Sequence, residues 1–141
     1  MNRGQTINQV TGTVLGAAID VHRALGPGLL ESAYQRCLCY ELKLRTLPFV
    51  QELSLPVRYK GMDVDAAYRI DLLVDDRVVV EIKAVQIILP IHTAQLITYL
   101  KLGNWPVGLL INFNVELLKN GVTRLANNYT GPLPSIPEDS Q

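Results

Sequence analysis

The chain has 141 residues, of which 48% are hydrophobic and 18% are charged, and its 13 basic and 13 acidic residues cancel to a net charge of zero. This length is that of one domain with a sizeable core, and the composition excludes a disordered chain, a polycation and an acidic tail protein. The charge balance also argues against a large non-specific contact with nucleic acid, which needs many Lys and Arg side chains. Neither a membrane span nor a signal peptide is visible, so we expect a soluble cytoplasmic protein without membrane contact.

Two helices are predicted at the start of the chain. Apolar residues recur every three or four positions over residues 6–25, and Gly26-Pro27-Gly28 ends this first helix. A second helix is predicted over residues 29–45. Cys37 and Cys39 would point about 200° apart on it, so we interpret them as two reduced thiols rather than a disulfide or a metal pair.

Three strands follow: apolar and polar residues alternate with a period of two in the first two, and the third is rich in β-branched residues. They form an antiparallel meander and are predicted at residues 53–59, 63–74 and 78–83, with turns at Gly61 and at Asp75-Asp76. Pro56 indicates that the first of them lies at an edge or carries a bulge.

The rest of the chain completes a mixed sheet. A third helix is predicted over residues 90–102, a strand buried on both faces over residues 107–111, and a short last strand over residues 123–126. The order of elements predicts an α/β fold with helices flanking the sheet. We expect a single domain over residues 1–129 and a flexible tail over residues 130–141.

The charged residues of the meander form a site only in one register. Glu81 and Lys83 share one face of the third strand. A two-residue turn at Asp75-Asp76 would place Asp71 on the opposite face from Glu81. A three-residue loop at 75–77, or an equivalent bulge, pairs residue 74 with 78 and Asp71 with Glu81, and places Arg69 opposite Lys83. We predict this second register.

Two opposed carboxylates repel each other, and a hard divalent cation would supply the reason for placing them together. The metal would be Mg²⁺ or Mn²⁺, held by Asp71 and Glu81, and the backbone carbonyl of Ile82 between the charged side chains is a further candidate ligand. Lys83 beside the metal could stabilise an anionic transition state or orient a water. A carboxylate-held metal beside a lysine is typical of phosphodiester hydrolysis.

Asp71 followed by Glu81-Ile82-Lys83 on the next strand resembles the D…(D/E)-x-K signature of the PD-(D/E)XK nuclease superfamily. The order of elements resembles that superfamily's restriction-endonuclease-like αβββαβ core with an extra N-terminal helix. The segment from Gly28 to Tyr34 matches G-x-x-E-x-x-Y. With DLLVDDRVVVEIKAV, HTAQLITYL and GLLINFN, it resembles the small bacterial GxxExxY family over residues 7–127. Ile70 stands where the superfamily signature has a proline, as in many members.

The resemblance implies roles for residues on two helices. Glu31 is similar to the acid that many members carry near the metal on the first core helix, and Gln95 and Tyr99 resemble a Q-x-x-x-Y motif that borders the site and the substrate. Each has a structural alternative. Glu31 favours the dipole of its own helix N-terminus, and a Gln–Tyr pair four residues apart can be a buried contact.

Two further candidate residues and a set of basic side chains have open roles. His92, one turn before Gln95, is a candidate substrate contact or a helix cap, and Arg69 touches phosphate or pairs with Asp71. Five basic residues form either a modest positive rim for nucleic acid or a scattered solvated surface: Arg36, Lys43, Arg45, Arg58 and Lys60.

The leading hypothesis is a Mg²⁺- or Mn²⁺-dependent nuclease with catalytic residues Asp71, Glu81, Lys83 and Glu31, acting on DNA or RNA. The alternative is a nuclease-fold binding or assembly module that does not cleave in isolation, which the zero net charge favours. A third reading is a homo-oligomer with a structural role. The sequence does not distinguish DNA from RNA or internal from terminal cleavage, and it leaves the oligomeric state open.

Overall fold

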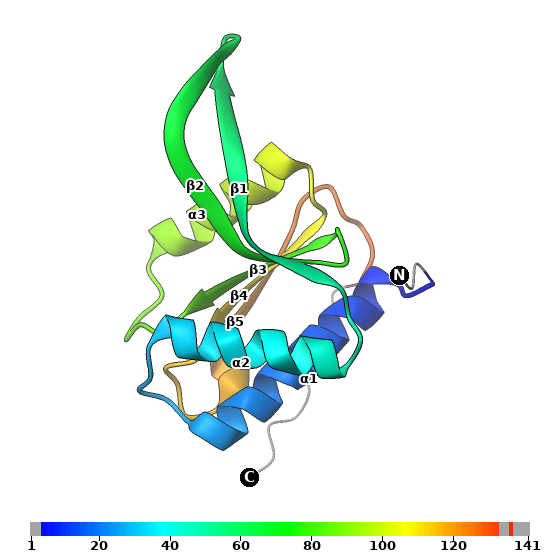
Figure 1. Cartoon of the computed structure of the whole chain (residues 1–141), viewed down its shortest axis with the longest axis vertical. Coiled ribbons are helices and arrows are strands. Elements are labelled where there is room, and N and C mark those ends of the chain that lie inside the picture. The colour runs from blue at the N-terminus through cyan, green and yellow to red at the C-terminus, as the bar shows by residue number, and fades with distance from the viewer. Residues whose placement is uncertain (1–3, 133–135, 137–141) are drawn as a thin grey trace.

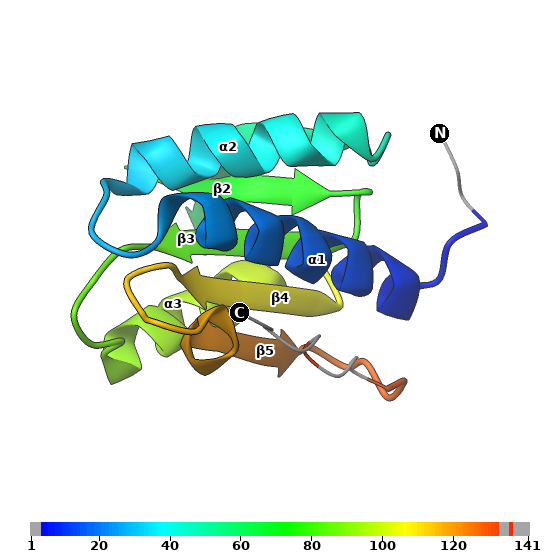
Figure 2. The same ribbon diagram turned by 90° about the horizontal axis from the view of Figure 1, so that it is seen from below.

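The computed structural model describes residues 4–132 and residue 136, and in it one five-stranded sheet is flanked by helices on both faces. The elements in chain order are α1 (Ile7–Leu25), α2 (Glu31–Leu44), β1 (Phe49–Tyr59), β2 (Met62–Val74), β3 (Val78–Lys83), α3 (Pro90–Gly103), β4 (Val107–Asn112), the 3₁₀ helix η1 (Leu118–Gly121) and β5 (Val122–Ala126). Helices α1 and α2 pack against one face of the sheet and α3 against the other (Figures 1 and 2).

The predicted α/β fold with a mixed sheet is confirmed. The strand order is β1-β2-β3-β4-β5, with antiparallel pairing throughout except for the parallel pair β3–β4. All six residues of β4 are buried, as expected for a strand covered on both faces. Cys37 and Cys39 are free thiols. Within the described part of the chain, no helix is both long and apolar enough to cross a membrane.

Strand β1 differs most from its prediction, because it begins at Phe49 rather than at residue 53. The sequence pattern does not show the first residues of β1, because Gln51 and Glu52 are both polar; both are also exposed. Glu52 also has a φ of 53°, which interrupts the regular alternation of a strand. The expectation from Pro56 is confirmed: β1 is an edge strand, and its register with β2 shifts between Leu55 and Val57. Helix α2 is shorter at both ends than the predicted 29–45.

The β1–β2 hairpin extends beyond the body of the sheet as an arm, defined here as residues 56–69 (Figure 1). Tyr59 pairs with Met62, so the turn at its tip has two central residues, Lys60 and Gly61, with φ of 49° and 81°. Positive φ at both positions is the geometry of a type I′ turn. The predicted turn at Gly61 is therefore confirmed, and it lets the two strands twist together out to the tip.

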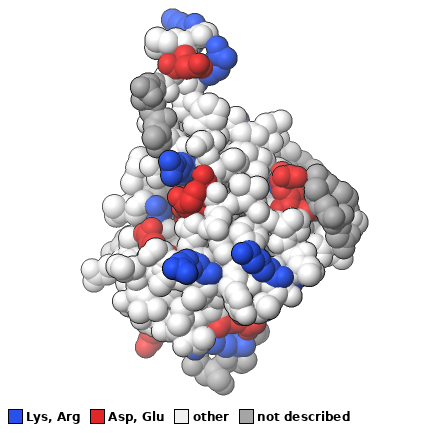
Figure 3. All heavy atoms as spheres, in the orientation of Figure 1, with Lys and Arg blue, Asp and Glu red and all other residues white. Residues whose placement is uncertain are grey.

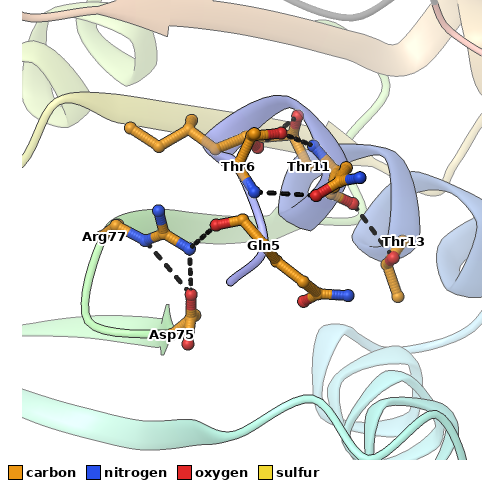
Figure 4. Close-up of polar contacts among 8 residues, drawn as sticks. Gln5, Thr6, Thr11, Thr13, Asp75 and Arg77 are labelled. Carbon is orange, nitrogen blue, oxygen red and sulfur yellow. Dashed lines mark hydrogen bonds and ion pairs between the residues drawn. The ribbon is translucent and has the colours of Figure 1, made fainter. Parts of the chain in front are cut away.

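The loop between β2 and β3 decides the register on which the predicted site depends. Val74 pairs with Val78, so the loop has three residues, and the predicted register is confirmed. Asp75 is 2% exposed and pairs with Arg77 of the same loop. The Arg77 guanidinium also donates to the carbonyl oxygen of Gln5, at 2.8 Å, which ties the loop to the segment before α1 (Figure 4).

The expected division into a domain over residues 1–129 and a flexible tail over 130–141 stays a prediction. Most of the tail, residues 133–135 and 137–141, lies outside the residues that the structure describes.

Candidate functional site

Asp71 and Glu81 come together where the backbone pairing of β2 with β3 ends. The ladder runs from Val74 and Val78 to Leu72 and Val80, and the two acids are the next residues in this register. The Asp71 N–H donates to Glu81 Oε2 at 2.7 Å, and the Ile82 N–H donates to Asp71 Oδ2 at 2.7 Å. Each carboxylate therefore accepts a backbone N–H from the opposite strand, and this exchange holds the two acids as a pair.

Burial raises the pKa of both carboxyl groups. For Glu81, which is 8% exposed, burial and the neighbouring charge of Asp71 raise the pKa from 4.5 to about 8. The pKa of Asp71 is also raised, chiefly by burial. The charge of Lys83 works in the opposite direction and lowers the pKa of both acids. In the absence of a metal, the acid pair therefore retains a proton near neutral pH.

Lys83 lies two residues beyond Glu81 on the α3 side of the sheet, the side on which Val79 packs. Asn112 of β4 supports the end of this strand. Its side-chain Oδ1 accepts the Val85 N–H at 3.1 Å, and its Nδ2 donates to the Val85 carbonyl oxygen at 2.9 Å. The Phe113 N–H donates to the carbonyl oxygen of Lys83 at 2.9 Å. These bonds fix the backbone from which the lysine side chain extends.

Glu31 reaches the same region from the other side. It is the first residue of α2, and it lines a cavity of about 440 Å³ together with Gln35, Glu52 and Asp71. The loop before α2 is fixed by Tyr34, whose hydroxyl donates to the Gly26 carbonyl oxygen at 2.6 Å. The charge of Glu31 contributes to the raised pKa of Asp71, although less than burial and the charge of Glu52 do.

Glu52 is a residue of this region that sequence reasoning missed. Its register position on β1 is opposite Asp71, between the pairs Gln51–Leu72 and Leu53–Ile70. Its carboxylate accepts a hydrogen bond from Gln35 Nε2 at 2.9 Å, and its charge raises the pKa of both Asp71 and Glu81. The available signal was its place in the hairpin: counting back from the turn at Gly61 brings residue 52 close to residue 71.

Two oxygen-rich acids side by side are the donors that Mg²⁺ and Mn²⁺ prefer. Among the residues that the structure describes, no three His, Cys, Asp or Glu side chains converge as a group that could hold a metal ion. The structure thus assembles Asp71 and Glu81, whereas metal ligation by Glu31 and by the Ile82 carbonyl stays a prediction. The Ile82 backbone does take part in the site through its N–H, which binds Asp71.

Helix α3 places Tyr99 beside the acid pair, with 8% of its surface exposed. Burial, followed by the charge of Glu81, raises the pKa of its hydroxyl, so this ring borders the site. Gln95 is exposed one turn earlier and lines the same groove as Tyr99. Helix α3 itself packs closely on the sheet, because a Cβ added at Gly108 of β4 would lie 3.0 Å from Leu96.

His92 and Arg69 do not lie together at the acid pair, where contact with a shared substrate would need them. His92 Nδ1 accepts the Leu89 N–H at 3.0 Å, which is the helix-capping alternative. Arg69 is exposed and pairs with Ser54 in the β1–β2 ladder, and the β2–β3 ladder ends before it could face Lys83. A substrate contact by either residue stays a prediction.

The basic residues do not form a continuous rim. Arg45 pairs with Glu41 and Asp20, and Arg58 pairs with Asp63. The Lys60 ammonium lies 5.3 Å from the centre of the Tyr59 ring. On the face shown in Figure 3, Lys and Arg form separate spots with Asp and Glu among them. The described surface fits the scattered alternative better than the rim.

Comparisons with known proteins add one finding. The sequence model of the PD-(D/E)XK nuclease superfamily matches residues 8–125, which include the acid pair, Lys83 and α3. No curated protein and no solved structure matches the chain.

Proposed function

Since the chain belongs to the PD-(D/E)XK nuclease superfamily, we propose that it is a divalent-metal-dependent nuclease that hydrolyses phosphodiester bonds in DNA or RNA. The observation that carries the proposal is the reciprocal bonding of Asp71 and Glu81 across β2 and β3, with Lys83 on the same side of the sheet. The segment Gly28–Tyr34 further supports membership of the GxxExxY family. The two free thiols fit a reducing, cytoplasmic setting.

The acid pair fits a hard divalent cation. Its two hydrogen bonds use only one oxygen of each carboxylate, so Asp71 and Glu81 are the residues that would hold a cation. Burial and mutual repulsion raise the pKa of Glu81 to about 8, and a bound cation would remove the repulsion and displace the retained proton. Glu31 and Glu52 add negative charge nearby, which strengthens the attraction for a cation.

Each residue has a role in the proposed reaction. A bound Mg²⁺ or Mn²⁺ supplies Lewis-acid chemistry and an activated water. Asp71 and Glu81 hold and orient the cation, and the backbone bonds between their strands keep both side chains in place. The Lys83 ammonium stabilises the negative charge that develops on the phosphate. Tyr99 and Gln95 border the site and position the substrate strand.

Cleavage assays with Mn²⁺ on single- and double-stranded DNA and RNA test the proposal. We expect Glu81→Ala and Lys83→Ala each to lose about 100-fold or more of the activity, the size seen when one charge-stabilising group is removed. Asp63→Ala is the matched control, because this carboxylate lies on the exposed arm, where it pairs with Arg58. Equal activity in all four preparations would mean a contaminating nuclease and would refute the enzyme claim.

A second candidate is a nuclease-fold module that binds or assembles without cleaving alone. The zero net charge and the scattered basic residues favour it, because nucleic-acid affinity draws mainly on Lys and Arg. The intact acid pair and lysine favour the enzyme. Thermal melting with and without Mn²⁺ separates the two, since an ion that binds only the folded protein raises the melting temperature. A melting temperature unchanged by Mn²⁺ would favour the module.

A further inference from the structure

A groove runs between the arm and α3. It encloses about 400 Å³, and Val57 and Tyr68 from the arm and Ile91, Gln95, Tyr99 and Leu102 from α3 are among the residues that line it. This volume is in the range of small-molecule sites. The groove is large enough for a planar ring system and too small for a folded protein segment with its own core.

The lining combines aromatic rings with a few polar groups. Tyr68, which is 43% exposed, and Tyr99, which is 8% exposed, come from elements on the two sides of the groove. Ile91 and Leu102 add aliphatic surface, and the Gln95 amide and the Thr98 hydroxyl are exposed beside them. Aromatic and aliphatic walls with a few hydrogen-bonding groups are what holds an unstacked nucleobase, which is recognised by its flat faces and its polar edge.

The groove also borders the acid pair, because Tyr99 belongs to both. The Tyr99 hydroxyl is close enough to Glu81, Tyr68 and Asp71 for each of them to affect it electrostatically. A ligand in the groove would therefore lie beside the place where Asp71 and Glu81 meet. This continuity favours a ligand that belongs to the substrate rather than a separate partner.

The charge of the molecule points in the same direction. Of the arm and α2 basic residues, Arg58 pairs with Asp63, and Arg45 pairs with Asp20 and Glu41. Because the chain also has no net charge, phosphate contacts supply only part of the affinity for a substrate, and stacking of bases supplies more.

We infer that the groove between the arm and α3 binds an unpaired nucleobase adjoining the phosphate to be cut, so that the substrate is a single strand or a nucleotide flipped out of a duplex. This inference rests on the proposed nuclease function and deepens it. Tyr68 contacts a face of the base, and Tyr99, Gln95 and Thr98 line the rest of the groove around it.

Binding without metal tests the inference separately from cleavage. Affinities are measured in EDTA for a fluorescently labelled single strand, for the same strand made abasic throughout, and for a blunt duplex. We expect the single strand to bind more tightly than the other two. We expect Tyr68→Ala to weaken single-strand binding about 10-fold, the size expected for one lost stacking contact, and to leave abasic binding unchanged.

Three variants make the result specific. Tyr68→Phe keeps the ring and should bind as the wild type does, whereas Ala94→Trp fills the groove from an exposed position of α3 and should weaken binding as Tyr68→Ala does. Tyr40→Ala removes an exposed ring on α2, away from the groove, and should have no effect.

Equal affinity of the wild type, Tyr68→Ala and Ala94→Trp for the single strand would overturn the inference, as would equal binding of the abasic strand or no binding of any strand. Loss of self-association by Ala94→Trp with unchanged strand binding would also overturn it, because the groove would then be a contact between copies. If Tyr68→Ala cleaves as fast as the wild type with Mn²⁺, the proposed nuclease function would stand, but the inferred base-binding role of the groove would be refuted. If binding depends on the bases but no strand is cleaved, base binding by the groove would stand and the proposed nuclease function would be refuted.

Discussion

At the scale of single residues, the acid pair stores unfavourable electrostatic energy in the metal-free protein. Glu81 is buried beside Asp71, and the bond from the Asp71 N–H only partly compensates the loss of water. Lys83 offsets some of the repulsion and Glu52 adds to it. Such an arrangement lowers stability in order to hold charge in one place, which is typical of functional sites rather than of structural ion pairs.

This energy predicts a pH-dependent stability. Because the pKa of Glu81 is raised to about 8 in the folded protein, the folded state holds a proton that the unfolded state gives up near pH 4.5. Stability of the metal-free protein should therefore fall as the pH rises from about 4.5 to 8. Glu81→Gln keeps an oxygen for the Asp71 N–H and removes the charge, so it should be the more stable protein at pH 9 by a few kcal/mol.

The measurement is chemical denaturation in EDTA at pH 5 and pH 9, with Asp63→Asn on the arm as the control. The advantage of Glu81→Gln should shrink strongly at pH 5, where the wild-type carboxyl is protonated in the folded state. A variant that is less stable than the wild type at pH 9, or an advantage independent of pH, would contradict this account of the pair.

At the scale of elements, the site depends on a loop that lies outside it. The three-residue connection between β2 and β3 aligns Asp71 with Glu81, and a side-chain period of two means that a slip of one residue would separate them. Asp75 and Arg77 close this loop, and Arg77 joins it to Gln5 before α1. The register is thus secured by contacts between distant parts of the chain.

Removal of Arg77 should show this dependence. Arg77→Met leaves the Asp75 carboxylate buried without its cation, and we expect a loss of about 3 kcal/mol in the free energy of unfolding. Arg58→Met on the arm removes an exposed ion pair and should cost much less. Urea titrations of both variants provide the measurement, and equal stability of the two would contradict a structural role for the loop pair.

The packing of α3 on the sheet gives a second prediction at this scale. Gly108→Ala would place a methyl group 3.0 Å from Leu96 and 3.2 Å from Leu100, both fully buried, so it should destabilise the protein by about 1 kcal/mol. The same substitution at Gly12 of α1 meets open space and should stabilise the helix by a similar amount. Thermal melts compare the two, and a stabilising Gly108→Ala would show that α3 is free to shift.

At the scale of the whole molecule, the residues of the proposed site come from three structural layers. The acid pair and Lys83 lie on the sheet, Tyr99 and Gln95 on α3, and Glu31 on α2 on the other side. The arm projects beside α3 (Figure 1), so a single strand of nucleic acid could follow the groove toward the acid pair. The chain as a whole carries no net charge to attract a duplex from a distance.

The equal numbers of basic and acidic residues should make the binding of single-stranded nucleic acid only weakly dependent on salt. A chain with 13 basic and 13 acidic residues should neutralise few phosphates, so we expect log K for a single strand to fall with log salt with a slope no steeper than about −3. Anisotropy titrations between low and physiological salt measure the slope. A slope near −7, which corresponds to about ten phosphates, would contradict the account and require a basic surface made by several copies.

Much of this architecture could be predicted from sequence, because alternation and helical periodicity are local. The strand around Asp71 followed from the period of two, and the strand around Glu81 followed from its β-branched residues. The three-residue loop was predicted because the site requires it and not from its own residues, since Asp75-Asp76 alone suits a two-residue turn. The bond from Arg77 to Gln5 joins residues 72 positions apart, and no local pattern predicts it. Glu52 was missed because Gln51 and Glu52 are both polar, so the alternation of β1 was recognised only from Leu53 onward.

The central claim is that Asp71 and Glu81 together bind a divalent cation, and calorimetric titration with Mn²⁺ at pH 7 tests it most directly. Run in two buffers of different ionisation heat, the titration of the wild type should show one ion bound and close to one proton released, because the cation displaces the proton that the pair retains. Glu81→Gln should lose both signals, and Asp63→Asn should keep them. A wild type that gives no ion-dependent heat, or a Glu81→Gln variant that binds Mn²⁺ equally well, would contradict the claim.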